Sequence, residues 1–178
     1  MINEVLHFWF EEIDPSFWWK KDVDFDLLII EKFTSLHQQA CACELYTWRD
    51  SAQGCLAEVI ILDQFSRNMF RDSGKAFAQD ALALALAQQA ISRGIDKQLT
   101  AIQRSFLYLP FMHSESSIIH QQAEKLYTEN AIQNNLDFEL KHKRIIDQFG
   151  RYPHRNAILK RQSSASEIAF LEQPGSSF

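Results

Sequence analysis

Cysteine, glycine and proline are all scarce in this 178-residue chain, which holds 3 Cys, 5 Gly and 4 Pro. An odd number of cysteines without CxxC spacing argues against a disulfide framework and against a zinc finger. Few helix-breaking residues and an apolar content of 46% exclude a disordered chain. The sequence therefore predicts a protein built of long regular elements. It also predicts a reducing compartment, which we expect to be the cytoplasm.

The sequence also lacks a positive net charge, a basic leader and a long apolar run. Its net charge of −5 disfavours nucleic acid or an acidic membrane as a partner. The N-terminus carries acids where an export signal needs basic residues. The apolar stretches, such as 81–87, fall well short of the roughly 20 residues that cross a bilayer. We expect one domain over residues 1–173 and a frayed tail at 174–178, with no membrane contact.

What the chain does contain is apolar residues at three- and four-residue steps, the period of an amphipathic helix. The predicted helices cover 2–12, 22–41, about 50–65, 76–93, 99–109, 114–134, 136–149 and 164–172. No strand-like alternation competes with them. The prediction is an all-α fold of about seven to nine helices in antiparallel hairpins, suited to a tetratricopeptide-repeat-like stack.

Capping and helix-breaking residues set the predicted starts and ends of the helices. Asp50, with Gln53 three residues later, and Ser114 are expected to begin helices, and Ser164 forms a capping box with Glu167. Gly94 and Gly150 suit the left-handed residue that follows a helix, and Pro110 is expected to end the helix before it. The helix at 76–93 is apolar on most of its circumference, which predicts a central, heavily buried element.

Three polar stretches are the candidate functional residues. The first, at 62–71, places Asp63 and Arg67 on one helix face, and Arg71 extends that row if the helix continues. Asn68 lies on a neighbouring row. These polar residues follow a strongly apolar turn, so two interpretations stay open: they brace a neighbouring loop inside the fold, or they line a cleft and contact a ligand.

The second stretch, at 109–117, brings His113 and Glu115 to the start of a predicted helix. A helix N-terminus carries free amides and a positive partial charge, which favour an anion. The pair lacks metal-ligand spacing, and His120, seven residues after His113, is weak support for a metal. We therefore predict no metal and no cofactor.

The third stretch, at 149–161, lies in a basic region where seven Lys or Arg between 141 and 161 face one acid. Its candidate residues are Arg151, His154, Arg155, Asn156 and Arg161. Guanidinium groups suit bidentate contact with a carboxylate or a phosphate. Arg151 and Arg155 have two open roles: to clamp internal carboxylates such as Asp63 or Glu115, or to hold an anionic ligand.

No known nucleophile motif, P-loop or dinucleotide fingerprint is present, so the catalytic residues remain unassigned. The first hypothesis is a pocket for a small anionic ligand, with Glu115 or His113 as general base and Arg155 as charge stabiliser if it is an enzyme. The alternatives are a scaffold that binds a peptide or a partner protein and, least favoured, RNA binding through 141–161. The sequence leaves the oligomeric state open.

These stretches, LDQFSRNMFR, PFMHSESS and FGRYPHRNAILKR, together with the N-terminal VLHFWF, resemble the bacterial family called domain of unknown function 924. The resemblance covers nearly the whole chain. The chain differs from the family pattern at Ser66, Ser116 and Lys160. The resemblance implies an all-helical fold similar to tetratricopeptide-repeat proteins, and it implies no established activity or catalytic residue.

Overall fold

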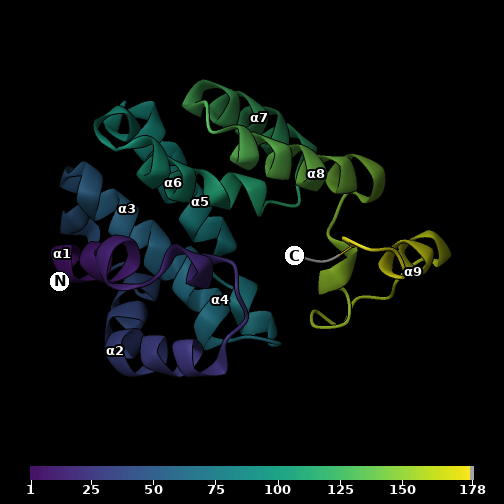
Figure 1. The fold of residues 1–178 in the computed structure, drawn as a ribbon, viewed down its shortest axis with the longest axis horizontal. Helices are drawn as coiled ribbons and strands as arrows, with labels where there is room; N and C mark the ends of the chain where they lie inside the picture. Colours follow the sequence, from purple (N-terminus) through teal and green to yellow (C-terminus); the bar gives the residue numbers. More distant parts are fainter. Residues whose placement is uncertain (177–178) are drawn as a thin grey trace.

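The computed structural model describes residues 1–176, which form helices joined by short turns (Figure 1). The α-helices are α1 (Ile2–His7), α2 (Val23–Cys41), α3 (Ala52–Ile60), α4 (Ser66–Met69), α5 (Asp80–Ser92), α6 (Ala101–Met112), α7 (Ser117–Asn130), α8 (Gln133–Phe149) and α9 (Ala165–Leu171). No strand occurs in these residues, so the predicted all-α fold is confirmed. No helix of this part of the chain is long and apolar enough to span a bilayer.

Aromatic side chains fill the core between the N-terminal segment and the following helices. Trp9 lies in a π-helical turn, Phe8–Glu12, and packs edge-on against Phe65 and Phe106 with ring centroids 5.6 and 5.8 Å apart. Phe33 of α2 stacks on Phe65 at 4.7 Å. Edge-to-face and offset contacts are the favoured geometries of aromatic pairs. This cluster fixes α1 and α2 against the chain between α3 and α4.

The central helix is α3, and not the segment predicted at 76–93. Every α3 residue except Gln53 is buried, and α3 packs against α1, α5 and α6. In α5 only Ala83, Leu86, Ala87 and Ala90 are buried. The prediction of a heavily buried helix there was wrong because an apolar composition does not show whether both faces find a partner. One face of α5 lies in solvent, and exposing alanine side chains there costs little free energy.

Two predicted helix starts and one predicted end are corrected. α3 begins after Ser51, whose side chain accepts from Gly54 N–H, because residues up to Asp50 form a 3₁₀ turn. α7 begins after Ser116, and not at Ser114. α6 runs through Pro110 to Met112, since a proline in the last turn removes one hydrogen bond and His113 N–H still donates to Leu109 O.

The C-terminal part follows α8, which ends at Phe149 and is terminated, as predicted, by Gly150 with a φ of +69°. A 3₁₀ turn, Pro153–Arg155, leads to α9, which begins with the predicted Ser164–Glu167 capping box and lies at the edge of the molecule (Figure 1). A small apolar cluster of Ile145, Ile146, Phe149, Tyr152 and Phe170 joins these elements. Of the predicted tail, residues 174–176 form a turn and residues 177–178 lie outside the described residues.

Gly54 is the glycine whose lack of a side chain the packing requires. A Cβ at this position would lie 2.0 Å from Trp48 O, a backbone atom that cannot move aside. We predict that Gly54→Ala lowers the free energy of unfolding by about 2–3 kcal/mol in urea titrations. Gly74→Ala is the control, because its Cβ would meet Leu159 at 3.4 Å, and equal losses in both variants would contradict the packing argument.

Candidate functional site

The three predicted polar stretches lie close together in the fold. Each of them is at the end of a helix or in the turn that follows one. Asp63 belongs to a π-helical turn, Ile61–Phe65, between α3 and α4. His113 follows the last residue of α6, and Arg155 belongs to the 3₁₀ turn after α8. π-Helical turns inside α-helices are frequent at functional sites.

Asp63 and His113 form a hydrogen-bonded dyad. Asp63 Oδ1 lies 2.8 Å from His113 Nδ1, and because a carboxylate only accepts, the ring donates its Nδ1–H. Asp63 is 1% exposed, and the His113 side chain is 15% exposed. Arg67 also approaches Asp63 Oδ1, at 3.0 Å, and donates to the Asp63 carbonyl at 2.8 Å. The dyad thus leaves His113 Nε2 as the basic atom.

The surroundings tune both members of the dyad. Burial opposes the charge of Asp63, but Arg67 and His113 outweigh it and hold the Asp63 pKa below its ordinary value. Burial, assisted by the positive charge of Arg67, lowers the pKa of His113. His113 is therefore neutral at neutral pH, the state in which an imidazole can accept a proton.

Next to the dyad, two guanidinium groups converge on one carboxylate. Asp80, the first residue of α5, lies 3.1 Å from Arg67 Nη2 and 3.1 Å from Arg155 Nη1. Burial and the nearby charge of Arg67 lower the pKa of Arg155. Asp63, Arg67, Asp80, His113 and Arg155 are called the polar cluster below.

Aromatic rings hold Arg155 in place. Its guanidinium carbon lies 4.4 Å from the centre of the Phe77 ring and 4.7 Å from that of Tyr152, so two aromatic rings pack against it. Arg155 Nε is buried and has no hydrogen-bond partner among the described residues. A buried donor of this kind is costly unless something accepts from it.

Glu115 and Arg161 form a second, adjoining ion pair. Arg161 donates to both Glu115 oxygens at 2.6 and 2.9 Å, and to Asn156 Oδ1 at 2.9 Å. Glu115 also accepts from Tyr152 N–H at 2.8 Å. Burial opposes the charge of Glu115, but the hydrogen bonds from Arg161 and Tyr152 lower its pKa. Both oxygens of Glu115 already accept hydrogen bonds within the fold. Of the two predicted bases, His113 is therefore better placed to take a proton from a ligand.

Tyr152 links this region to two buried histidines, His120 and His142, and to the partly buried His154. Its hydroxyl donates to Met112 O at 2.5 Å and lies 3.2 Å from His120 Nε2, and His120 Nδ1 lies 2.7 Å from Glu139 Oε1. The rings of His142 and His154 pack on the Tyr152 ring at 5.8 and 5.5 Å. These groups brace the C-terminal segment from inside the protein.

Three predicted residues lie apart from the polar cluster. α4 ends at Met69, so Arg71 is out of register with Arg67, and it pairs with Asp26 of α2 at 2.5 Å. Asn68 donates to the same Asp26 at 2.8 Å. Arg151 clamps Glu167 of the last capping box at 2.6 and 2.8 Å. All three brace the fold.

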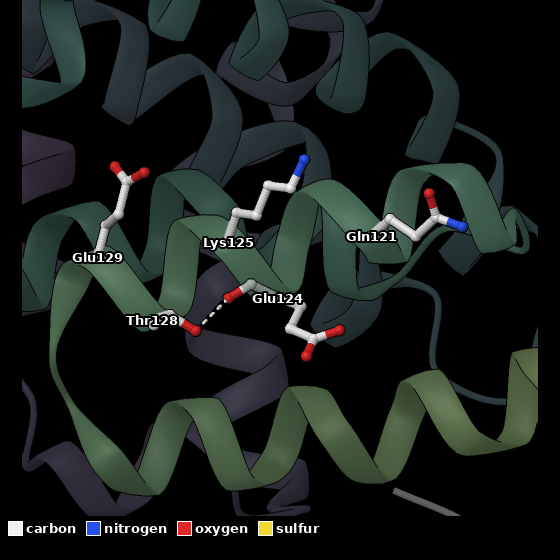
Figure 2. A pocket seen from close by; sticks show the side chains of 5 residues that line it. All are labelled: Gln121, Glu124, Lys125, Thr128 and Glu129. Carbon is white, nitrogen blue, oxygen red and sulfur yellow. Dashed lines mark hydrogen bonds between the residues drawn. The ribbon is translucent and has the colours of Figure 1, made fainter.

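Two surface hollows lie away from the polar cluster. One is lined by Met1, Ile2, Asn3 and Trp48. The other, in Figure 2, is lined by Gln121, Glu124, Lys125, Thr128 and Glu129, which all project from α7. A single helix provides no convergent set of groups for a ligand. The described residues hold no group of three or more His, Cys, Asp or Glu arranged for a metal ion.

The sequence interpretation missed Asp80, Phe77 and Tyr152. An acid at the first position of an apolar helix is a common stabilising residue, so Asp80 carried no separate signal. Phe77 and Tyr152 are two of many aromatic residues. Only their place beside Arg155 distinguishes them.

Comparison with known proteins finds a family but no activity. The model of a family described as "Bacterial protein of unknown function (DUF924)" matches residues 5–175. The solved structure of a protein of unknown function, ATU0120, from Agrobacterium tumefaciens is 36% identical in sequence, covers 97% of both chains and gives a TM-score of 0.92. No curated protein matches the chain.

Two histidines with lowered pKa values predict a loss of stability in acid. Burial lowers the pKa of His142 to about 3, and burial together with Arg155 lowers that of His154 to about 4. Between pH 6.5 and these values the unfolded chain binds protons that the folded chain does not. Stability therefore falls as the pH falls, by about 1.4 kcal/mol per pH unit for each histidine.

Urea titrations at pH 5 and pH 6 test this expectation. His142→Phe should have a smaller pH slope than the parent by about 1.4 kcal/mol per unit. Ile146→Val, which shortens a buried side chain of the same helix and removes no titrating group, should lower stability equally at both pH values and keep the parental slope. The same slope in the parent and in His142→Phe would show that His142 is not kept neutral by the fold.

Proposed function

This chain belongs to the DUF924 family of bacterial proteins of unknown function, and we propose that it binds a small anionic molecule at the polar cluster. The observation that carries this proposal is the convergence of Arg67 and Arg155 on the single carboxylate of Asp80. Two guanidinium groups from distant parts of the chain, side by side, are typical of a site for a carboxylate or a phosphate.

Directed donors, and not an excess of charge, attract the ligand. With His113 neutral, the carboxylates of Asp63 and Asp80 balance the two guanidinium groups. Each guanidinium has five N–H donors, and one of them, Arg155 Nε, is buried without a partner in the described residues. Asp80 accepts from both arginines, and a ligand oxygen can accept from the same two guanidinium groups in its place.

The exposure of the side chains gives the direction of approach. Arg67, Asp80 and His113 are 20, 18 and 15% exposed and form the outer part of the polar cluster. Arg155, 8% exposed, lies beneath them. The ligand therefore meets Arg67 and His113 first, and it must be small because the exposed part is small.

The dyad gives this site a candidate for proton transfer. A buried carboxylate that accepts from Nδ1–H fixes the tautomer and the orientation of the imidazole, as in acid–base catalysis by other histidines. In the proposed enzyme His113 Nε2 is the general base, and Arg67 and Arg155 stabilise negative charge on the bound molecule. Asp63 is a positioning residue.

A thermal-shift panel of inorganic phosphate, phosphorylated metabolites and small carboxylates tests binding. A ligand at a hundred times its dissociation constant adds roughly 2.7 kcal/mol, which raises the Tm by about 5–10 °C. We expect Arg155→Ala to lose this rise. Arg71→Ala, whose ion pair with Asp26 lies outside the polar cluster, should keep it. A flat panel for the parent would contradict the proposal.

Removing the internal competitor gives a sharper prediction, because it expects a gain. Asp80→Asn frees both arginines of their shared carboxylate, so a ligand found in the panel should bind about tenfold more tightly in calorimetric titrations. Asp26→Asn, which frees Arg71 in the same way, should leave the affinity unchanged. Weaker binding by Asp80→Asn would show that Asp80 positions the arginines and does not compete.

A further inference from the structure

The ion pair between Arg155 and Asp80 leaves one buried donor and one buried acceptor unused. Arg155 Nη1 donates to Asp80 Oδ2 at 3.1 Å, while Arg155 Nε donates to no described residue. Asp80 Oδ2 also accepts from Arg67 Nη2 at 3.2 Å, whereas Asp80 Oδ1 accepts no hydrogen bond within residues 1–176. Asp80 Oδ1 lies 3.1 Å from Arg67 Nη2, so it shares in the ion pair without accepting that N–H. The unused donor and the unused acceptor therefore belong to two side chains that are already in contact.

Of the unused carboxylate oxygens in this protein, Asp80 Oδ1 is the one that a ligand can reach. Asp96 Oδ1 and Glu139 Oε2 also accept no hydrogen bond in the described part of the chain, but their side chains are 1 and 0% exposed. Asp80 differs because it lies in the outer part of the polar cluster. Leaving a buried polar atom unpaired is costly, so both unused atoms of the ion pair favour a molecule that satisfies them.

We propose that the ligand of the polar cluster is a small carboxylate that carries a hydroxyl or an ammonium group on the carbon next to the carboxylate. This inference rests on the function proposed above and names the class of its ligand. The ligand's carboxylate accepts from Arg155 Nε and from guanidinium N–H groups that Asp80 Oδ2 now holds. Its hydroxyl or ammonium group donates to Asp80 Oδ1. A molecule with an acceptor and a donor on neighbouring atoms thus satisfies both unused atoms.

The charge of the polar cluster favours this class over phosphate. With His113 neutral, its two carboxylates balance its two guanidinium groups, so the polar cluster has no net charge. A phosphate adds about two negative charges to largely buried side chains, and burying charge without compensation is costly. A 2-hydroxy carboxylate adds a single negative charge, and a 2-amino carboxylate adds no net charge.

Titration of the full chain with glycolate, glycine and propionate tests the proposal. These molecules have the same number of non-hydrogen atoms, and they differ only in the hydroxyl, ammonium or methyl group next to the carboxylate. We expect glycolate or glycine to bind at least about tenfold more tightly than propionate. The tighter of the two distinguishes a hydroxy from an amino carboxylate. Molecules this small bind weakly, so the titrations extend to about 50 mM at constant ionic strength.

The nuclear magnetic resonance signal of Arg155 Nε–H reports the contact directly. This signal is identified in proton–nitrogen correlation spectra by its loss in Arg155→Lys. It should shift downfield as glycolate or glycine is added, because Nε–H then gains an acceptor. Propionate should produce the same shift only at about tenfold higher concentration.

Asp80→Ala tests the acceptor, because it removes Oδ1. The advantage of glycolate or glycine over propionate should fall to about equal affinity, while propionate binds no more weakly than to the parent. Asp26→Ala removes the carboxylate of the Arg71 ion pair and should keep the parental ratio of affinities. Circular dichroism confirms that each variant is folded. If Asp80→Ala does not fold, the ratio in the parent and the Arg155 signal still decide.

Inorganic phosphate separates failure of this inference from failure of the proposed function. Equal affinities of the parent for glycolate, glycine and propionate, or an unshifted Arg155 signal, would overturn the inference. An advantage that survives in Asp80→Ala would overturn it too. Binding of phosphate without binding of any carboxylate would overturn the ligand class and leave the anion site in place. If neither phosphate nor a carboxylate binds, the proposed function fails as well.

Discussion

The buried charge of Asp63 is the constraint on which the rest of the arrangement depends. An isolated carboxylate that is 1% exposed is too costly to keep, so the fold must deliver donors to it. Arg67 comes from the next helical turn and His113 from the end of α6, fifty residues later. The packing of α6 against α3 brings His113 to the carboxylate, and removal of either partner would leave the buried Asp63 with one donor fewer.

Asp63 is the first member of a chain of ion pairs in which negative and positive side chains alternate. Arg67 pairs with both Asp63 and Asp80, and Asp80 also pairs with Arg155 of the C-terminal segment. Because each group depends on the next, their positions are fixed before any ligand arrives. Such preorganisation is what a binding or catalytic site requires. It also explains how residues that brace the fold can be the residues proposed to bind a ligand.

The sequence predicted the helices well, and it predicted some of the contacts within the candidate site. Asp63 and Arg67 lie four residues apart, so their contact follows from helix geometry alone. Contacts between distant segments do not follow, and Arg71 and Arg151 pair with carboxylates of α2 and α9 instead. The errors at Asp50 and Ser114 arise because a side chain of the capping type does not show where the capping residue's own backbone is extended, as it is at Ser51 and Ser116. A 3₁₀ turn moved the first start by one residue.

Tyr152 fastens the chain after α8 with its N–H, its carbonyl and its hydroxyl, and two ion pairs, Arg155–Asp80 and Arg161–Glu115, complete the attachment. Most of this attachment is polar, whereas the helices before it share one apolar core of aliphatic and aromatic side chains. Added salt screens partly exposed ion pairs much more than apolar contacts. Residues 150–176 therefore form a unit whose local opening, seen as amide hydrogen exchange, becomes easier with ionic strength while the remaining helices keep their protection.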